Sequence, residues 1–189
     1  MPKLRTFIAV EAAPPVRKRA LELIERLRPT QANVKWVGAA ELHWTLKFLG
    51  DVTPLELPDL CDALEEAASD VAPFEIQAVG AGAFPEISRP RTVWLGVGEG
   101  EAEFVALHDR IKDALAPLGF REEQRRFRPH LTLGRVRRSP EGVDELGQLI
   151  ADHATFPGGQ MTVSELVIFS SRQERHGPVY EALSRVPLS

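Results

Sequence analysis

Two short segments of the chain share the pattern His-x-Thr-Leu. The first begins at His43 and the second at His130, 87 residues further along the chain. Chance placement of the chain's His, Thr and Leu residues predicts on the order of 0.02 such patterns. The repeat therefore marks these residues as candidates for chemistry.

Each copy is typical of a strand, and a strand turns successive side chains to opposite faces. The His and the Thr of one copy are two residues apart and share a face. The residue between them and the final Leu share the opposite face and build core. If the two strands lie side by side about a pseudo-two-fold axis, their polar faces converge on one cleft. The four groups that would meet there are His43, Thr45, His130 and Thr132.

These four groups suit acid and base catalysis on a phosphate. Two imidazoles that flank an anion can act as a proton donor and a proton acceptor, because the ordinary pKa of imidazole lies near neutrality. Two threonine hydroxyls can donate hydrogen bonds to phosphate oxygens without adding charge. Removing one such preorganised donor typically costs on the order of 10²–10³ in rate. The set favours in-line displacement at phosphorus without a metal ion.

Other chemistries fit the sequence less well. A single His on a strand is more often a structural, half-buried residue, and only the pairing favours catalysis. A zinc site needs three or more protein ligands in recognisable spacing, whereas the two motifs supply one His each and Asp51 lies eight residues after His43. No Gly-x-Ser-x-Gly segment indicates a nucleophilic serine. Among the other histidines, His108 is expected at the surface or boundary of a helix, His153 at a helix end and His176 in a polar loop, all outside the site.

The overall charge limits the class of partner. The 189 residues include 23 Lys and Arg against 27 Asp and Glu, which gives a net charge of −4. This balance argues against general affinity for long nucleic acid, which depends on basic contacts with phosphates. The arginines are nevertheless concentrated near the second motif, and such a patch suits a small or terminal anionic ligand, although a solvated arginine face is an equally good interpretation. The patch consists of Arg121, Arg125, Arg126, Arg128, Arg135, Arg137 and Arg138.

Cysteine content and hydropathy indicate the compartment. Cys61 is the only cysteine, so neither an intrachain disulfide nor a cysteine-based zinc cluster is expected. No segment has the pattern of a secretory leader or the 18 apolar residues of a membrane span. We therefore expect a cytoplasmic protein that does not enter a membrane.

Hydrophobic periodicity and turn residues predict the elements that must position the motifs. Helices are expected at 15–28, 54–68, 104–118 and 142–152. Strands are expected at 6–10, 34–37, 42–49, 74–79, 92–97, 127–136, 161–169 and 179–183, with Pro85 and Pro90 marking a turn region between 79 and 92. Strands that pair in sequence and are interrupted by single helices indicate the α+β class, with antiparallel or mixed sheets.

With these residues identified, the sequence resembles the 2H phosphoesterase superfamily, and within it the bacterial and archaeal RNA 2′,3′-cyclic phosphodiesterases, also called 2′-5′ RNA ligases. The resemblance runs nearly end to end. It rests on the first strand at 5–9, the first motif region at 34–50, a mid-chain segment at 84–97, the second motif region at 127–135, and a closing segment with Ser171 and residues 177–180. Trp44, where the family often has Leu, is a mild departure on the non-catalytic face.

The resemblance implies one bilobal domain, residues 1–189, in which two pseudo-symmetric lobes surround a central groove that holds both motifs. It implies hydrolysis of a terminal 2′,3′-cyclic phosphate, on RNA or on a nucleotide, to a 2′-phosphate without a metal or another cofactor. His43 is assigned as the general acid that protonates the departing O3′, and His130 as the general base that activates water, although near-symmetric motifs could exchange these roles. Thr45 and Thr132 would hold the phosphate. We expect the protein to act as a monomer.

Six further side chains are candidate RNA contacts. Arg128 shares the face of His130, whereas strict alternation turns Arg135 away from the site, so a salt bridge that supports the strand is as good an interpretation as ligand contact. Aromatic rings can hold a single-stranded end by stacking on its bases. The aromatic candidates, each also suited to the core, are Phe7, Trp36, Phe84 and Tyr180.

Two other functions stay open on the sequence alone. RNA ligation between a cyclic phosphate and a 5′-hydroxyl is the chemical reverse with an alcohol in place of water, so the same residues would serve both reactions. A non-catalytic module that binds RNA ends is the second alternative. The intact pair of motifs argues against that module, because binding alone needs no proton donor and acceptor.

Overall fold

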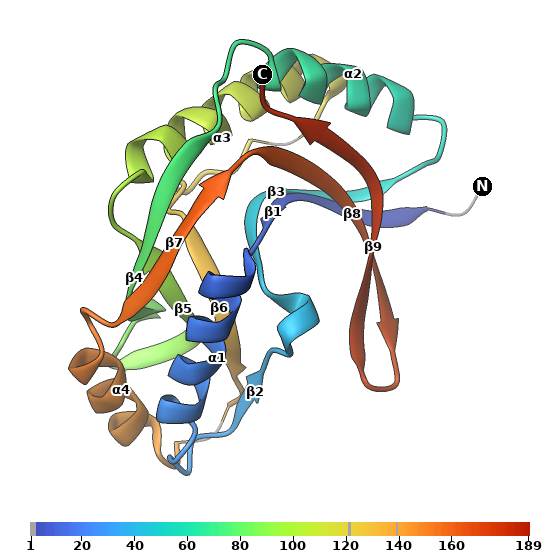
Figure 1. Cartoon of the computed structure of the whole chain (residues 1–189). Coiled ribbons are helices and arrows are strands. Elements are labelled where there is room, and N and C mark those ends of the chain that lie inside the picture. The colour runs from blue at the N-terminus through green and yellow to red at the C-terminus, as the bar shows by residue number, and fades with distance from the viewer. Residues whose placement is uncertain (1–2, 121, 139) are drawn as a thin grey trace.

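The chain folds into nine strands and four α-helices within the residues that the computed structural model describes, which are 3–120, 122–138 and 140–189 (Figure 1). Arg121 of the basic patch lies outside these residues. The strands are β1 (Leu4–Glu11), β2 (Val34–Trp36), β3 (His43–Val52), β4 (Phe74–Glu86), β5 (Arg89–Val97), β6 (His130–Val136), β7 (Pro157–Val163), β8 (Glu165–Glu174) and β9 (Gly177–Pro187). The helices are α1 (Pro14–Leu27), α2 (Leu57–Ala68), α3 (Glu101–Leu115) and α4 (Val143–Asp152). The predicted α+β class is confirmed.

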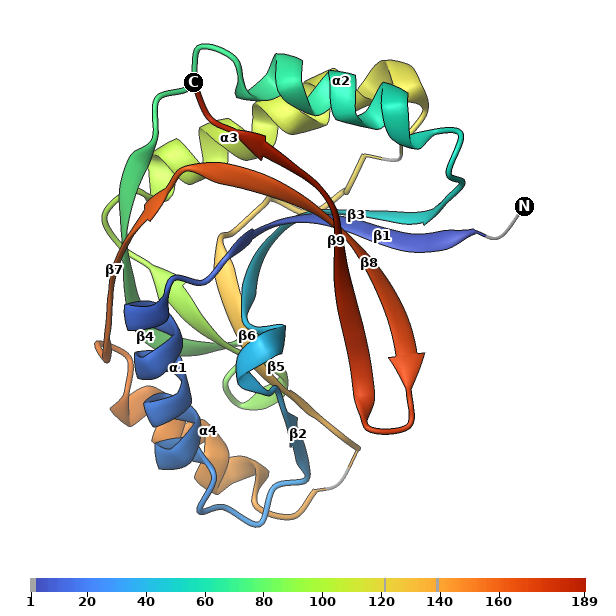
Figure 2. The same ribbon diagram turned by 45° about the vertical axis from the view of Figure 1, so that its right-hand side comes forward.

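The strands form one curled antiparallel sheet in the order β7-β4-β5-β6-β3-β1-β8-β9, and β2 pairs with β6 beside this path. The sheet has two halves, β7-β4-β5-β6 and β3-β1-β8-β9. They meet where β3 pairs with β6 through Trp44 and Leu131. The hairpin of β8 and β9 extends beyond the rest of its half (Figure 2). This arrangement puts both motif strands at the centre of the molecule.

The helices tie the two halves together. α1 follows β1 but packs against β7 and α4, in the other half, whereas α3 follows β5 and packs against α2 and β3 (Figure 1). Prolines occupy the first turn of α1, where a missing N–H has no helical partner. Its buried face is the one that helical spacing predicts, namely Val16, Ala20, Leu23, Ile24 and Leu27. No helix in the described ranges is both long and apolar enough to cross a membrane.

The two motif strands have the same local structure. Over seven residues, β3 from 43 and β6 from 130 show the same order of buried and accessible side chains. In both strands one extra residue follows the Thr, because Leu46 is skipped in the register with β1 and Leu133 is skipped in the register with β5. Such a β-bulge opposes two residues to one and shifts the alternation beyond it. Side chains after each bulge therefore face the opposite way from strict alternation.

Three predicted elements are corrected by the structure. The segment between 79 and 92 is not a turn region, because β4 and β5 continue almost to the tip of a long hairpin. Pro85 and Pro90 pair with each other near that tip, next to an irregularity in the register, which is the kind of position that tolerates proline in a sheet. The segment 161–169 spans two strands, β7 and β8, and the strand expected from 127 begins at 130.

Substitution of Trp44 tests how much the packing at the junction between the two halves of the sheet stabilises the fold. It is 1% exposed and packs edge-on against Phe104, with ring centroids 6.0 Å apart. Trp44→Ala should lower the free energy of unfolding by about 3–5 kcal/mol, because it leaves a cavity in the core. Urea unfolding measures this change, and Trp44→Leu should lose less because it refills part of the volume. A loss below about 1 kcal/mol for the alanine variant would contradict this packing.

Candidate active site

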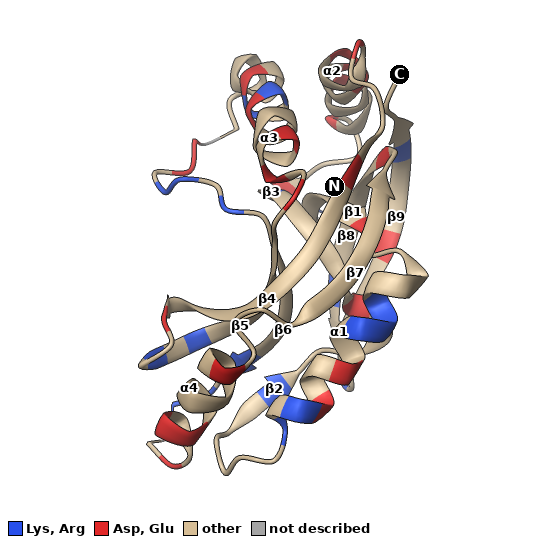
Figure 3. Cartoon of the chain, turned by 60° about the vertical axis from the view of Figure 1, so that its left-hand side comes forward, with Lys and Arg blue, Asp and Glu red and all other residues tan. Residues whose placement is uncertain are grey.

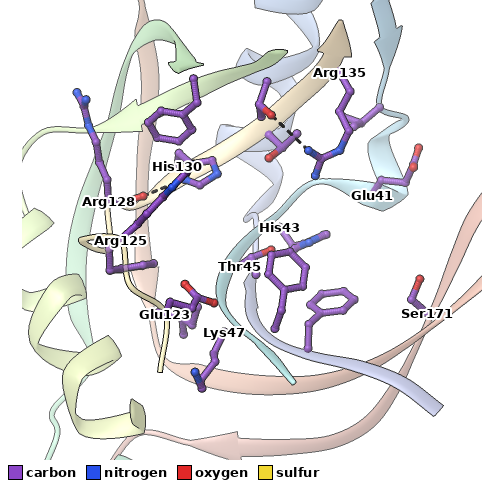
Figure 4. A pocket seen from close by; sticks show the side chains of 18 of the residues that line it. Glu41, His43, Thr45, Lys47, Glu123, Arg125, Arg128, His130, Arg135 and Ser171 are labelled. Atoms are coloured by element: carbon purple, nitrogen blue, oxygen red, sulfur yellow. Dashed lines mark hydrogen bonds between the residues drawn. The ribbon is translucent and has the colours of Figure 1, made fainter. Parts of the chain in front are cut away.

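A cavity of about 1460 Å³ lies between the two halves of the sheet. Figure 4 shows His43 and His130 reaching it from β3 and β6, with Thr45 beside the first and Arg128 beside the second. Every side chain that the sequence analysis proposed for the site lines this one cavity. They are Phe7, Trp36, His43, Thr45, Phe84, Arg128, His130, Thr132, Arg135 and Tyr180.

The register of β3 and β6 explains why the motif side chains meet. The central residues of the two motifs lie opposite each other, so the same antiparallel register sets each His across from the Thr of the other copy. The facing pairs are His43 with Thr132 and Thr45 with His130. Opposite side chains in an antiparallel pair lie on the same face of the sheet. No hydrogen bond ties either threonine hydroxyl to another side chain or carbonyl in the described ranges, so both can donate to a bound anion.

Each imidazole is oriented by the backbone two residues before it. Nδ1 of His130 lies 2.8 Å from the carbonyl oxygen of Arg128, and His43 makes a backbone hydrogen bond with Glu41. When Nδ1 donates its hydrogen to a carbonyl oxygen, the neutral ring carries its proton on Nδ1 and its free lone pair on Nε2. His130 therefore keeps Nε2 for a ligand, and His43 keeps the ring nitrogen that does not bond to the backbone.

Aromatic rings surround each imidazole. The ring centroid of His43 lies 4.8 Å from that of Phe7 and 5.1 Å from that of Tyr180. The ring centroid of His130 lies 4.9 Å from that of Phe84, in edge-on geometry. These contacts remove much of each imidazole from water.

Burial lowers the pKa of both histidines. Because burial disfavours the cation, the pKa of His43 falls to about 4, and the positive charge of Arg135 adds to the effect. The pKa of His130 is lowered for the same main reason, with further contributions from Arg135 and Arg128. In the ligand-free protein both imidazoles are therefore neutral at pH 7. A bound phosphate anion would raise both pKa values, because a nearby negative charge favours the imidazolium form.

Arg135 lines the cavity, so the expectation that it faces away from the site is wrong. The bulge at Leu133 is the reason, because the extra residue returns Arg135 to the polar face of β6. Its Nη1 donates a hydrogen bond of 3.3 Å to Thr92 Oγ1, and no carboxylate in the described part of the chain pairs with it. Its charge acts on His43 as well as on His130. The guanidinium is therefore placed to bind an anion between the two histidines.

Phe48 is a cavity residue that the sequence analysis missed. It follows His43 by five positions, as Arg135 follows His130, and both lie just after the bulge of their strand. Phe48 is 59% exposed although it is a large apolar side chain, and it lines the cavity near Phe7, with centroids 6.1 Å apart. Extending the comparison of the two motifs beyond the shared Leu would have found this position.

The predicted aromatic contacts differ in the surface that they offer. Phe7 is 3% exposed and belongs to a small buried cluster, so it supports His43 and has no free face. Trp36, Phe84 and Tyr180 are half-buried and keep accessible surface in the cavity.

The remaining histidines lie outside the cavity. The expectation that His108 lies at the surface or boundary of its helix is wrong, because it is 7% exposed and stacks on Phe127 at 4.1 Å. A segment distant in sequence covers this face of α3. His153 directly follows α4, as predicted, and His176 is exposed in the turn between β8 and β9. Across the described residues, no three His, Cys, Asp or Glu side chains converge as metal ligands.

Comparison with known proteins agrees with this geometry. The family model of the 2′-5′ RNA ligase superfamily matches residues 14–175, which include both motifs. The chain belongs to the 2′-5′ RNA ligase superfamily. A curated relative in Methanothermobacter thermautotrophicus, named RNA 2′,3′-cyclic phosphodiesterase, is 36% identical over 178 residues, which are 94% of this chain and 95% of the relative. A relative of the same name in Thermotoga maritima is 33% identical over 180 residues, 95% of this chain and 93% of the relative.

Solved structures related to this superfamily member share its fold. TT0787 of Thermus thermophilus matches with a TM-score of 0.79 at 28% identity, over 98% of both chains. LigT of Escherichia coli, in complex with 3′-AMP, matches with a TM-score of 0.77 at 25% identity, over 100% of this chain and 99% of LigT. The resemblance that the two motifs indicate is confirmed.

The lowered pKa of His43 should make the stability of the protein depend on pH. In the unfolded chain an imidazole binds a proton below about pH 6.5, whereas folded His43 does so only near its pKa of about 4. Between these values the unfolded state binds more protons, so the free energy of unfolding should fall as the pH decreases, by up to roughly 3 kcal/mol from this residue.

Urea unfolding at pH 7 and at about pH 5 measures this effect. His43→Gln should show a shallower dependence on pH than the wild type, whereas His176→Gln, an exposed control, should match the wild type. The same steep dependence in His43→Gln would show that burial of this imidazole is not the cause.

Proposed function

We propose that this chain is an RNA 2′,3′-cyclic phosphodiesterase, which hydrolyses a terminal 2′,3′-cyclic phosphate on RNA or on a nucleotide to a 2′-phosphate. The observation that carries the proposal is the convergence of two His and Thr pairs, from β3 and β6, on one cavity. The names of the curated relatives, which this chain covers almost completely, support it. The proposed active form is a cytoplasmic monomer, since all the residues used come from one copy of the chain.

Binding of the cyclic phosphate would use donors that the cavity already presents. The two threonine hydroxyls can donate to the non-bridging oxygens, and the Arg135 guanidinium can bind the same anion with charge-assisted hydrogen bonds. Fixed donors of this kind stabilise the charge that develops in the transition state without reorganising. Thr45, Thr132 and Arg135 are therefore proposed to hold the phosphate between the two imidazoles.

The two imidazoles would move the protons of the reaction. Nε2 of His130 accepts a proton from water as the water oxygen bonds to phosphorus, and the ring nitrogen of His43 that faces the phosphate donates a proton to O3′ as the P–O3′ bond breaks. The products are a 2′-phosphate and a free 3′-hydroxyl. His130 ends protonated and His43 ends neutral, and exchange of these protons with solvent restores the starting forms. No step needs a metal ion.

Binding of the substrate would favour protonation of His43, the proposed general acid. In the free protein His43 is neutral at pH 7, because burial lowers its pKa to about 4. An anion held beside it raises that pKa and favours the protonated form that the proposed step requires. The near-symmetric surroundings of the histidines leave the exchange of their roles as the alternative.

The hydrolysis is tested with a short RNA that ends in a 2′,3′-cyclic phosphate, incubated with the purified protein and EDTA. The expected product is the 2′-phosphate. His43→Ala and His130→Ala should each lower turnover by at least about 10²-fold, because each removes one proton transfer. His176→Ala, which changes an exposed histidine outside the cavity, is the matched control.

Three results would contradict the proposed function or its mechanism. Full activity in both cavity variants would exclude the two-histidine mechanism, and loss of activity in EDTA that zinc restores would favour a metal site. Binding of the RNA without turnover would favour an end-binding module. Addition of an RNA with a 5′-hydroxyl tests ligation, since an alcohol would then compete with water for the cyclic phosphate.

The dependence of kcat/KM on pH should be bell-shaped, with its maximum below pH 6.5. In the free enzyme one histidine must be neutral and the other protonated, and the pKa values of both are lowered by burial. Activity should therefore fall at high pH as the acid loses its proton, and at low pH as the base gains one. The profile of kcat should lie at higher pH, because bound substrate raises both pKa values. An alkaline limb of kcat/KM that begins above about pH 7 would contradict the lowered values.

A further inference from the structure

The cavity carries more positive charge than the proposed reaction uses. Seven lysine and arginine side chains line it against three glutamates, in a chain whose net charge is −4. Arg128 and Arg135 act on the reacting centre, since both lower the pKa of His130. Arg125 and Arg126 are not among the causes of the pKa shift of either histidine. The charges of these two arginines are therefore not among those that act on the two imidazoles.

Arg125 and Arg126 belong to an irregular segment, residues 122–129, on the path from α3 to β6 (Figure 3). Both side chains are exposed and line the cavity. Neither has an ion pair or a hydrogen bond within the described residues. By contrast, Arg89 at the tip of the β4-β5 hairpin pairs with the carboxylate of Glu86. Of the charged side chains of the segment that line the cavity, three are arginines and one, Glu123, is a carboxylate, so the segment presents net positive charge along one wall of the cavity.

Packing fixes this segment against the rest of the protein. Phe127 stacks on His108, with centroids 4.1 Å apart and planes 3° apart, and meets Phe104 edge-on at 6.4 Å. The guanidinium of Arg128 lies over the ring of Trp94, 4.8 Å from its centroid. The neighbouring arginines are therefore held at the cavity wall before any ligand binds.

The size of the cavity allows more than one nucleotide. Clefts of roughly 300–1,000 Å³ accommodate ligands of drug size, and a nucleoside cyclic phosphate is such a ligand. The cavity here measures about 1460 Å³. A second nucleotide can therefore occupy the part that the basic segment lines.

We propose that Arg125 and Arg126 bind the phosphodiester groups that precede the cyclic phosphate, so that the substrate is the 3′ end of an oligoribonucleotide rather than a free cyclic nucleotide. This inference rests on the proposed function. A cyclic phosphate closes the 3′ end, so every other phosphate of the RNA lies on its 5′ side. Guanidinium groups bind phosphates through paired, charge-assisted hydrogen bonds, and such contacts carry no sequence information. The segment therefore selects for chain length and not for base sequence.

The test compares kcat/KM for uridine 2′,3′-cyclic phosphate, which has no upstream phosphate, with that for a uridine hexamer ending in the same group. The wild type should prefer the hexamer. In the double variant Arg125→Ala/Arg126→Ala this preference, taken as the ratio of the two values, should fall by about 10- to 100-fold through KM. The slope of log(kcat/KM) for the hexamer against log salt should become shallower by about 0.7 for each phosphate that the variant no longer binds.

Two further variants separate direct contact from charge alone and from loss of folding. Arg137→Ala/Arg138→Ala removes the same charge from exposed residues of the same patch that do not line the cavity, and it should keep the preference. Arg125→Lys/Arg126→Lys keeps the charge but loses the paired donors of the guanidinium, so it should keep only part of the preference.

The outcomes distinguish this inference from the proposed function. A wild type that hydrolyses the cyclic nucleotide and the hexamer equally well overturns the inference alone. An unchanged ratio in the alanine variant, or an equal loss in the Arg137/Arg138 control, also overturns it. A wild type that hydrolyses neither substrate overturns the proposed function as well.

Discussion

The antiparallel contact between β3 and β6 is the interaction on which the site depends. One residue pair, Trp44 with Leu131, joins the two halves of the sheet and fixes the register of the motif strands. Each polar face then meets the other across the cavity, and each buried face joins the same core. A shift of one residue in this register would turn one set of polar groups into the core. The convergence of the four motif side chains is thus a property of how two strands pair, while backbone groups of Glu41 and Arg128, outside these strands, orient the two imidazoles.

The electrostatics of the cavity favour an anion in two ways. Burial and neighbouring guanidinium groups keep both histidines neutral in the free protein. The same guanidinium groups have no carboxylate partners in the described part of the chain, so an entering phosphate supplies the missing counter-charge. Once it is bound, the balance at the histidines reverses, because the anion favours the imidazolium form. In the proposed reaction, the substrate therefore completes the acid and base pair that acts on it.

The sequence predicts those parts of the site that depend on local periodicity. The four motif side chains follow from strand alternation, which involves neighbouring residues only. Arg135 and Phe48 do not, since the bulges that turn them to the cavity arise from pairing with strands distant in sequence. Burial of His108 depends in the same way on Phe127, which folds back onto α3. The long hairpin of β4 and β5 also needs its partner strands, because its prolines alone favour a turn.

Two helices pack on the half of the sheet opposite to the strand that precedes them, and this packing has a mechanical consequence. α1 follows a strand of one half and packs on the other half, and α3 does the same in the opposite direction. The two halves are therefore held together by helix packing as well as by the sheet. Neither half could swing outward without pulling a helix from its packing. A fragment that held only one half would lack one of the helices that cover it. The walls of the cavity are therefore braced against each other by helices that each connect the two halves.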